Sequence, residues 1–488
     1  MLFNSYIFIF MFLPITLLLY FGFNKIKKYE IAKLVLVIAS LYFYAYFNVK
    51  YLFIIVASIL INYLFNRIFR KLKNKNFRKI LLIIGIAFNI GMIFYYKYYD
   101  FVISTINSLA STNFNLINVM LPLGISFFTF QQMAYVIDSY KGEVKDYTLL
   151  DYSLFVTFFP QLIAGPITLY SEMIPQFEDE KNKNFNSENF SKGLLAFSFG
   201  LAKKVLIADT FAIAANYVFA NPTDTNSTNL ILGMLSYTFQ IYFDFSGYCD
   251  MALGLGYMFN IKLPINFNSP YKSHSVIEFW KRWHMTLTRF FTTYIYIPLG
   301  GSRKGKIRTY INVFIVFLAS GIWHGANFTF ILWGILHGIA SILNRIFKNV
   351  IEKTNEVFNW ICTFLFINFT WVIFRADSIS DALNIIKHIL KLNFGPINSN
   401  ILDAFTLPEF TMITDLLGRK AWIAENYNTL YLLIFFAFAF FAILCMKNTQ
   451  ERVEEFKPST RNAIISAVLL VMSIISLSGV STFLYFNF

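Results

Sequence analysis

The sequence predicts an all-α integral membrane protein that crosses the bilayer many times. Of its 488 residues, 57% are hydrophobic and only 14% are charged, whereas about 25% of the residues in a soluble protein are charged. The apolar residues also occur in runs of the length that a transmembrane helix needs, about 20 residues. Together these observations exclude a soluble globular domain.

About 11 segments are apolar and long enough to be membrane spans. They cover residues 2–23, 31–48, 51–69, 80–97, 119–137, 229–248, 309–325, 327–344, 357–374, 429–446 and 461–482. The first is too long and too aromatic for a signal peptide, so we predict a retained span. Two further stretches, 152–166 and 191–220, are interrupted by Pro, Gly and Lys residues. They predict broken, re-entrant or tilted helices, and a broken helix is tolerated only where protein or a cavity covers the backbone.

Basic residues in the loops predict the orientation of the chain. Three lysines follow the first span, and seven cations with no acid lie in residues 67–79 after the third. Loops rich in Lys and Arg stay in the cytoplasm, which places loop 98–118 outside, loop 447–460 inside and both termini outside. The formal net charge of +14 therefore reflects orientation rather than binding to nucleic acid.

The chain is predicted to form one integral domain over residues 1–488, with an external loop at 376–428. Within this loop, Ala382–Leu392 has the pattern of an amphipathic helix lying on the membrane interface. The three cysteines are isolated in apolar surroundings and have no metal-ligand spacing. Packing is their expected role, and no metal site is predicted.

Two histidines in tryptophan-rich apolar sequence predict the chemical site. His284 ends the motif FWKRWH, and His324 stands between two glycines in GIWHG. An ionisable ring is costly in hydrocarbon, and imidazole is the side chain best suited to move a proton near neutral pH. The glycines are expected to leave room for a substrate. The alternative for these two is a structural histidine bonded to a carbonyl. His337 lacks such a setting, and packing is its expected role.

Other polar and aromatic residues are candidates for the walls of the same site. Gln240 and Asp244 lie in a hydrophobic segment and must pair with something, either as contacts between helices or by orienting a histidine. The basic turn at 298–305 serves topology, and its glycine amides would also suit phosphates. Further candidates for a tunnel or substrate site are Trp280, Lys281, Arg282, Trp283 and Trp323.

The last six residues, 483–488, form an aromatic motif that is expected on the external side. An interfacial anchor is one interpretation. In the other, Tyr485 is a nucleophile whose hydroxyl is acylated when an imidazole accepts its proton.

At these positions the sequence resembles the membrane-bound O-acyltransferase (MBOAT) family, in the branch that acetylates bacterial polysaccharides such as alginate. The resemblance rests on several long motifs in the same order. They are FFPQLIAGPI (158–167), DFSGY (244–248), NSPY (268–271), FWKRWH (279–284), YIPLGG (296–301), GIWHG (321–325) and WVIFRA (371–376).

The resemblance implies a ring of helices around a central tunnel in the bacterial cytoplasmic membrane. His324 matches the family's catalytic histidine, His284 its second active-site position, and Tyr485 a terminal motif that carries the acyl group outward. It implies acetyl-CoA or an acyl carrier thioester as donor substrate, with no permanently bound cofactor. An exported polysaccharide would be the acceptor and an extracytoplasmic SGNH-type acetyltransferase or glycan-synthesis complex the partner, with membrane lipids around the protein.

The hypothesis is that His324 acts as general base while His284 orients the donor or stabilises the oxyanion. Three alternatives remain open. They are D-alanyl transfer to teichoic acid from a carrier protein, O-acetylation of peptidoglycan, and a transporter or export channel without chemistry of its own.

Overall fold

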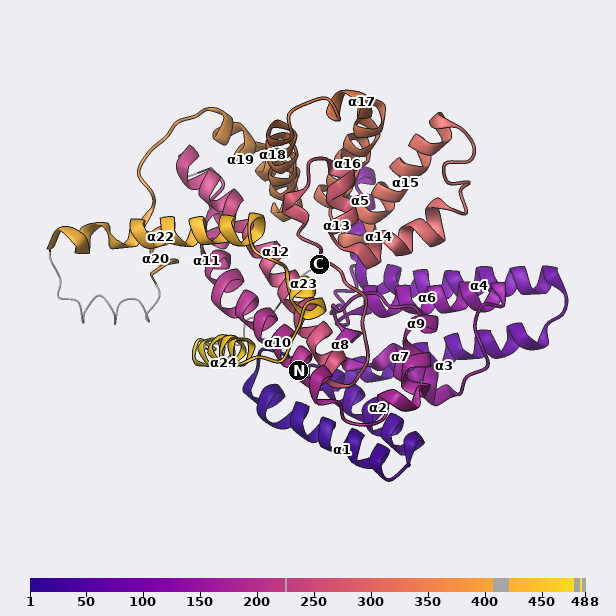
Figure 1. The fold of residues 1–488 in the computed structure, drawn as a ribbon. Coiled ribbons are helices and arrows are strands. Elements are labelled where there is room, and N and C mark those ends of the chain that lie inside the picture. The colour runs from indigo at the N-terminus through magenta and orange to yellow at the C-terminus, as the bar shows by residue number, and fades with distance from the viewer. Residues whose placement is uncertain (224–225, 407–420, 478–482, 485–488) are drawn as a thin grey trace.

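The computed structural model describes residues 1–223, 226–406, 421–477 and 483–484, and for residues 421–426 it describes the backbone only. These residues form helices joined by turns and extended loops, and no β-strand occurs among them. The all-α prediction is confirmed. The helices cross one another at varied angles around a buried centre (Figure 1).

The first helices follow the predicted spans closely up to residue 93. They are η1 (Phe8–Phe12), α1 (Leu13–Lys25), α2 (Tyr29–Ala45), α3 (Val49–Lys71), α4 (Lys75–Ile93), η2 (Phe94–Tyr98) and α5 (Tyr99–Ala110). The last three form a single helical run of 36 residues. Most of the predicted external loop 98–118 is therefore helical. No Pro or Gly interrupts residues 94–110, and the first left-handed residue after them is Ser111.

The fifth predicted span, 119–137, begins later than the hydrophobic pattern indicates. Helix α6 covers Ile125–Lys141, and residues 119–124 are not helical. Pro122 lacks an amide donor, and Gly124 takes a left-handed conformation at φ +70°, so the helix cannot start before it.

The interrupted stretches behave in two ways. Helices α7 (Leu149–Thr157), α8 (Phe159–Leu162) and α9 (Tyr170–Glu178) are short pieces, so a broken helix at 152–166 is confirmed. By contrast, α10 (Ser187–Ala202), η4 (Lys203–Ala208) and α11 (Asp209–Ala220) form a continuous helical run. Gly193 and Gly200 do not break it. A side chain at either position would collide with the backbone of α12, so these glycines allow close packing.

Helix α12 (Ser227–Met258) is the longest uninterrupted α-helix among the described residues, with 32 residues, and runs ten residues past the predicted end. It lies in the middle of the molecule, beside α10 and α11 (Figure 1). Nearly all of its side chains are buried in protein, so it presents little surface to lipid and serves as a central support.

The second half of the chain supplies the helices around the site and the outer C-terminal helices. They are η5 (Pro270–Lys272), α13 (Val276–Arg282), α14 (Met285–Phe291), η6 (Thr292–Tyr296), α15 (Lys306–His324), α16 (Phe328–Ile346), α17 (Lys348–Ile351), α18 (Glu356–Arg375), α19 (Ile379–Leu390), α20 (Ser399–Asp403), α22 (Ala421–Leu444), α23 (Thr449–Glu454) and α24 (Thr460–Ile475). A short 3₁₀ turn, η3 (Glu180–Asn182), precedes α10.

The predicted amphipathic helix exists as α19, but its apolar face does not lie on the membrane interface. Ala382, Ile385 and Ile389 are at most 5% exposed, because α19 packs against α12 and α18. Its periodicity arises from contact with protein rather than with lipid headgroups.

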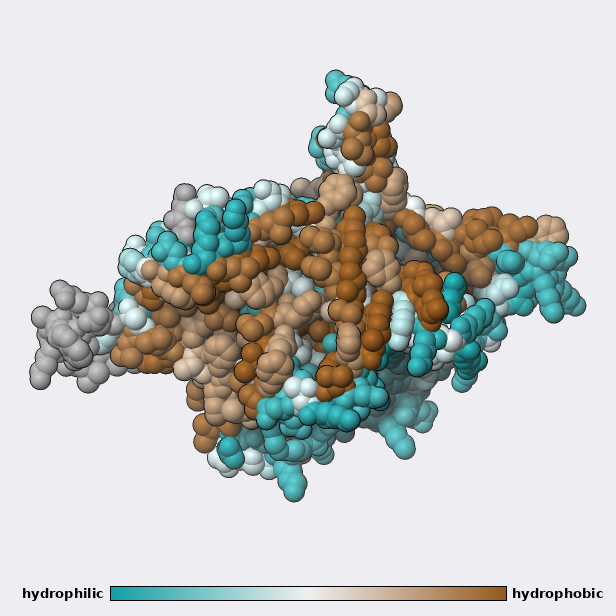
Figure 2. Space-filling view, turned by 90° about the horizontal axis from the view of Figure 1, so that it is seen from above, coloured by the Kyte–Doolittle hydropathy of each residue, from teal (hydrophilic) through white to brown (hydrophobic). Residues whose placement is uncertain are grey.

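Seven helical segments in the described residues are long and apolar enough to cross a membrane. Of the other predicted spans, α2, α6 and α24 have at most 17 residues, and α12 is less apolar. Figure 2 shows a broad hydrophobic area on one face, bordered by hydrophilic side chains. The chain is a multi-pass membrane protein.

Candidate active site

His324 is the last residue of α15, which ends inside the protein. Only 2% of the residue is exposed. The rings of Trp323, Trp333 and Phe374 meet the imidazole edge-on, with centroids 5.0, 5.1 and 5.2 Å away. This setting is apolar and poor in water, so electrostatic interactions act strongly there.

The two glycines beside His324 serve packing. A side chain at Gly321 would collide with the carbonyl oxygen of Phe330, and one at Gly325 would collide with the Phe330 ring. The space beside both glycines is therefore filled by α16. The expectation that they leave room for a substrate is wrong, because close approach of α15 and α16 uses that room.

The end of α15 is held by two side chains from the π-helical turn η2. The Lys97 ammonium donates hydrogen bonds to the carbonyl oxygens of Trp323 (2.8 Å) and His324 (3.0 Å). The Tyr98 hydroxyl donates to the carbonyl oxygen of Ile322 at 2.5 Å. The last carbonyls of a helix lack partners within it and carry a partial negative charge. Lys97 and Tyr98 thus fix the turn that carries His324.

His284 approaches the same place from another element. It precedes α14 in a left-handed conformation at φ +45°, and its side chain is fully buried. The Trp323 ring contacts both imidazoles, with its centroid 6.0 Å from that of His284 and 5.0 Å from that of His324. The structure therefore brings the two predicted histidines together.

Asn266 sets the protonation pattern of His284. Its side-chain oxygen accepts a hydrogen bond from the backbone N–H of Thr286 at 3.2 Å and lies 3.1 Å from Nδ1 of His284. Because a backbone N–H can only donate, the atom facing His284 is an acceptor, and Nδ1 must carry the proton. In the neutral ring, Nε2 then presents a lone pair.

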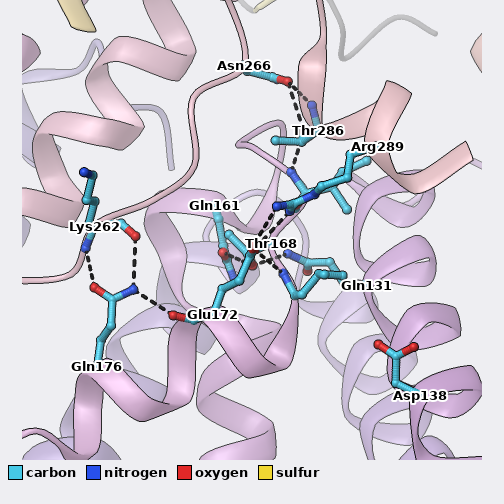
Figure 3. A network of polar contacts seen from close by, with 12 residues as sticks. Gln131, Asp138, Gln161, Thr168, Glu172, Gln176, Lys262, Asn266, Thr286 and Arg289 are labelled. Atoms are coloured by element: carbon cyan, nitrogen blue, oxygen red, sulfur yellow. Dashed lines mark hydrogen bonds and ion pairs between the residues drawn. The ribbon is translucent and has the colours of Figure 1, made fainter. Parts of the chain in front are cut away.

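Asn266 belongs to a larger polar network (Figure 3). The Thr286 hydroxyl donates to Asn266 and accepts from the backbone N–H of Ile167. Arg289, one turn further along α14, forms an ion pair with Glu172 and donates to the carbonyl oxygen of Ile167 at 3.0 Å. The motif at 158–167 and the loop before α14 are thereby tied together, which fixes the position of His284.

The two tryptophans of the FWKRWH motif are buried and pack against other aromatic side chains. Trp280 donates from Nε1 to Nδ1 of His337 at 3.1 Å, so Nε2 of His337 carries the proton and donates to the Thr370 hydroxyl at 3.1 Å. Trp283 packs against Trp371 with centroids 5.1 Å apart. Trp280 and Trp283 pack against neighbouring side chains, and His337 has the structural role that was expected.

Lys281 and Arg282 point away from the histidines. Lys281 is exposed. Arg282 forms an ion pair of 3.0 Å with Glu278 and donates to the carbonyl oxygen of Asn268. Arg282 therefore links α13 to the loop before it, and Lys281 lies at the protein surface.

Helix α12 carries the two predicted polar residues Gln240 and Asp244. Asp244 pairs with the Lys204 ammonium at 2.6 Å, and Lys204 also reaches Asp209 at 2.8 Å. Asp244 pairs with Lys204 rather than with a histidine ring, and Asn266 has the orienting role at His284. Gln240 is 6% exposed, and its side-chain oxygen has no hydrogen-bond partner in the described part of the chain.

The start of the C-terminal aromatic motif is buried against α12. The backbone N–H of Leu484 donates to Asp244 at 2.9 Å. The ring of Phe483 meets that of Tyr248 edge-on at 4.5 Å and lies beneath the Lys204 ammonium at 4.9 Å. Tyr485, the predicted acyl carrier, lies outside the described residues. The residues directly before it enter the protein interior.

Sequence reasoning missed four residues that the structure places in or near this site: Lys97, Tyr98, Lys204 and Asn266. A signal existed for the two lysines, since a cation in an apolar stretch implies a buried partner. Nothing in the local sequence of Asn266 distinguishes it, because its partner His284 is 18 residues away.

A family model described as MBOAT, membrane-bound O-acyltransferase family, matches residues 80–379 of the chain. The chain is also similar to a "Peptidoglycan O-acetyltransferase" of Helicobacter pylori, with 39% identity over 100% of this chain and 98% of the relative.

Two other groups of relatives match shorter parts. A "Probable alginate O-acetylase AlgI" of Pseudomonas aeruginosa is 39% identical over 78% of this chain and 73% of its own length. A "Teichoic acid D-alanyltransferase" of Bacillus subtilis is 29% identical over 50% of this chain and 63% of its own length. All three names describe transfer of an acyl group.

Proposed function

The chain belongs to the membrane-bound O-acyltransferase family and is a multi-pass membrane O-acyltransferase, and we propose that it moves an acetyl group from cytosolic acetyl-CoA to a cell-surface glycan. The observation that carries this proposal is the pair of buried histidines on either side of Trp323. The donor is multiply charged and the acceptor lies outside the bacterial cytoplasmic membrane, so only the small acetyl group needs to cross.

We propose peptidoglycan as the acceptor. The relative named for peptidoglycan matches over the whole chain, whereas the relative named for alginate matches 78% of it. The matched part therefore includes the outer N-terminal helices as well as the central motifs.

His324 is proposed as the general base. The oxygen of the accepting hydroxyl attacks the thioester carbonyl carbon while His324 takes the hydroxyl proton. The carbon–sulfur bond then breaks, and the leaving CoA thiolate takes the proton from His324. The transfer therefore needs no further co-reactant.

The tautomer of His284 supports one of the two roles considered for it. With Nδ1 donating to Asn266, the neutral ring offers Nε2 as an acceptor. An acceptor can hold an N–H group of the donor's pantetheine arm, whereas stabilising an oxyanion requires a donor. We assign His284 to positioning the thioester.

The buried C-terminal residues support a relay through Tyr485. The chain enters the interior at Phe483 and Leu484, next to Asp244 of α12. A tyrosine one residue further on would accept the acetyl group and pass it to an extracytoplasmic SGNH-type acetyltransferase. Both termini are proposed to face outside, so that this partner reaches the tail.

A carrier-protein donor is the remaining alternative, because the relative named for teichoic acid D-alanylation matches half of the chain. A channel without chemistry is excluded by membership of an acyltransferase family.

The test is mass spectrometry of the C-terminal peptide after the purified protein is incubated with isotopically labelled acetyl-CoA. We expect a labelled ester on Tyr485 that is absent in His324→Ala. In cells, the same variant should lack O-acetylated muropeptides. Normal muropeptide acetylation in His324→Ala would contradict the proposed base, and label transferred only from a charged carrier protein would contradict the proposed donor.

A further inference from the structure

A groove with a volume of about 940 Å³ has no histidine in its lining. Its walls come from α1, α10 and Leu470 of α24, with residues 183–185 at one end. In Figure 1, α10 lies between α24 and α1. None of the candidate site residues lines this groove, so it has a separate role.

Most of the groove is apolar. Buried side chains such as Leu13, Phe197 and Met258 form its floor, while Phe10 and Leu18 stand exposed at its rims, at 60% and 74%. Along η1 and α1 the lining extends from Ile9 to Lys25, which corresponds to about 24 Å at a helical rise of about 1.5 Å per residue. One leaflet of the hydrocarbon core is about 15 Å thick, so an extended acyl chain fits along the groove.

One end of the groove is positively charged. Lys25 and Lys183 belong to its lining, and the lining includes no Asp or Glu. Neither lysine forms a salt bridge within the described ranges of the chain. The Lys183 ammonium lies over the Tyr29 ring at 3.9 Å, which holds the cation at the mouth. This end carries the basic loop that the positive-inside rule places in the cytoplasm.

We propose that the groove binds an anionic diacyl phospholipid of the cytoplasmic leaflet. The acyl chains lie against the floor formed by α1 and α10, and the phosphate headgroup contacts Lys25 and Lys183. The bound lipid fills the space between α1 and α24 and holds these outer helices against α10.

The charge distribution favours a lipid over a helix of another protein. A phospholipid has one anionic end and one apolar end, as the groove has one cationic end and one apolar end. The groove also opens to a membrane in which such lipids surround the protein. A transmembrane helix would match the apolar part equally well but has no general need for two unpaired cations at one end.

The first experiment measures lipid binding to the delipidated, purified full-length protein by native mass spectrometry. Phosphatidylglycerol is the anionic probe and phosphatidylcholine with the same acyl chains is the neutral probe. We expect one tightly bound phosphatidylglycerol. Replacing Lys25 and Lys183 with Gln should weaken its binding by about five-fold for each lysine. The control double variant, Lys71→Gln with Lys75→Gln, changes two exposed cations outside the groove and should bind as the wild type does.

A glycine in the groove allows a second test that does not disturb the helix. A Cβ added at Gly22 would meet nothing within 4 Å, so Gly22→Leu fills the groove without a clash and improves the helix propensity of α1. Gly91→Leu is the matched control, since Gly91 is also in a helix, has equally open space and lies outside the groove. We expect Gly22→Leu to lose phosphatidylglycerol binding and its thermal stabilisation, and Gly91→Leu to keep both.

Unchanged elution and melting temperature without lipid would show that both leucine variants fold. Equal wild-type binding of the two lipids would overturn the proposed recognition of the headgroup. Undiminished phosphatidylglycerol binding by Gly22→Leu would overturn the proposed location. A wild-type dimer that Gly22→Leu converts to a monomer would place a second copy in the groove instead of the lipid.

Discussion

His324 and His337 lie on the same helical hairpin and are both buried, yet the protein holds them in different ways. The contacts that hold His337 go to its ring, where Trp280 and Thr370 bond the two nitrogens. At His324, Lys97 bonds the backbone carbonyl oxygen, and three aromatic rings meet the imidazole edge-on. Burial alone therefore does not identify a reactive histidine, and the chemistry of the groups around the ring is more informative.

The largest effect is expected at His324. His324→Ala should lower acetyl transfer by about 100- to 10,000-fold, the usual contribution of a general base. The measurement is the rate of labelled acetyl incorporation per folded molecule. The variant should still fold, because the backbone bonds to Lys97 do not depend on the ring. A loss of activity that only parallels a loss of folded protein would contradict this distinction.

Asn266→Ala should have the next largest effect, a fall in kcat of about 10- to 100-fold. The variant removes the acceptor that fixes Nδ1 of His284 as the protonated nitrogen, so both tautomers become populated. Asn266→Asp keeps an acceptor and should restore part of the activity, with an altered pH–rate profile. Asn312→Ala is the control, since Asn312 is also fully buried and donates to the carbonyl oxygen of Gly301 at 2.9 Å; an equal loss of kcat there would indicate a general packing effect.

Lys97→Met should lower kcat by about tenfold, which corresponds to about 1.4 kcal/mol. It leaves the last carbonyls of α15 without their cation, and the turn that carries His324 loses its anchor. Lys97→Arg retains a charged donor and should recover much of the activity. Lys79→Met, an exposed position on the same helical run, should leave kcat unchanged. A kcat for Lys97→Met equal to that of the wild type would remove Lys97 from the positioning of His324.

His337→Ala should have the smallest effect on catalysis, with an unchanged kcat per folded molecule. Its effect should appear in stability, because the Trp280 donor is left unsatisfied at a cost of about 1–3 kcal/mol. Thermal unfolding in detergent measures this change. If His337→Ala lowered kcat as much as His324→Ala does, the contrast between the two histidines would fail.

Local sequence was sufficient for features that depend on neighbouring residues. The apolar runs predicted most helices, and two histidines in apolar, tryptophan-rich motifs indicated the site. Local reasoning failed where a residue's role depends on a distant one. Gly193 and Gly200 look like helix breakers, but α12 packs against them. The periodicity of α19 looks interfacial, but α12 and α18 cover its apolar face.

The sequence by itself determined that this protein is helical, lies in the membrane and carries protonatable rings in apolar surroundings, since hydropathy and residue chemistry are local properties. Only the tertiary structure decided which partners bond the ring of His337, that Asn266 sets the tautomer of His284, and that Lys97 holds the end of α15. These outcomes depend on hydrogen bonds between residues up to 227 positions apart. Such bonds form because a buried polar group must find a partner, and the fold determines which partner is within reach.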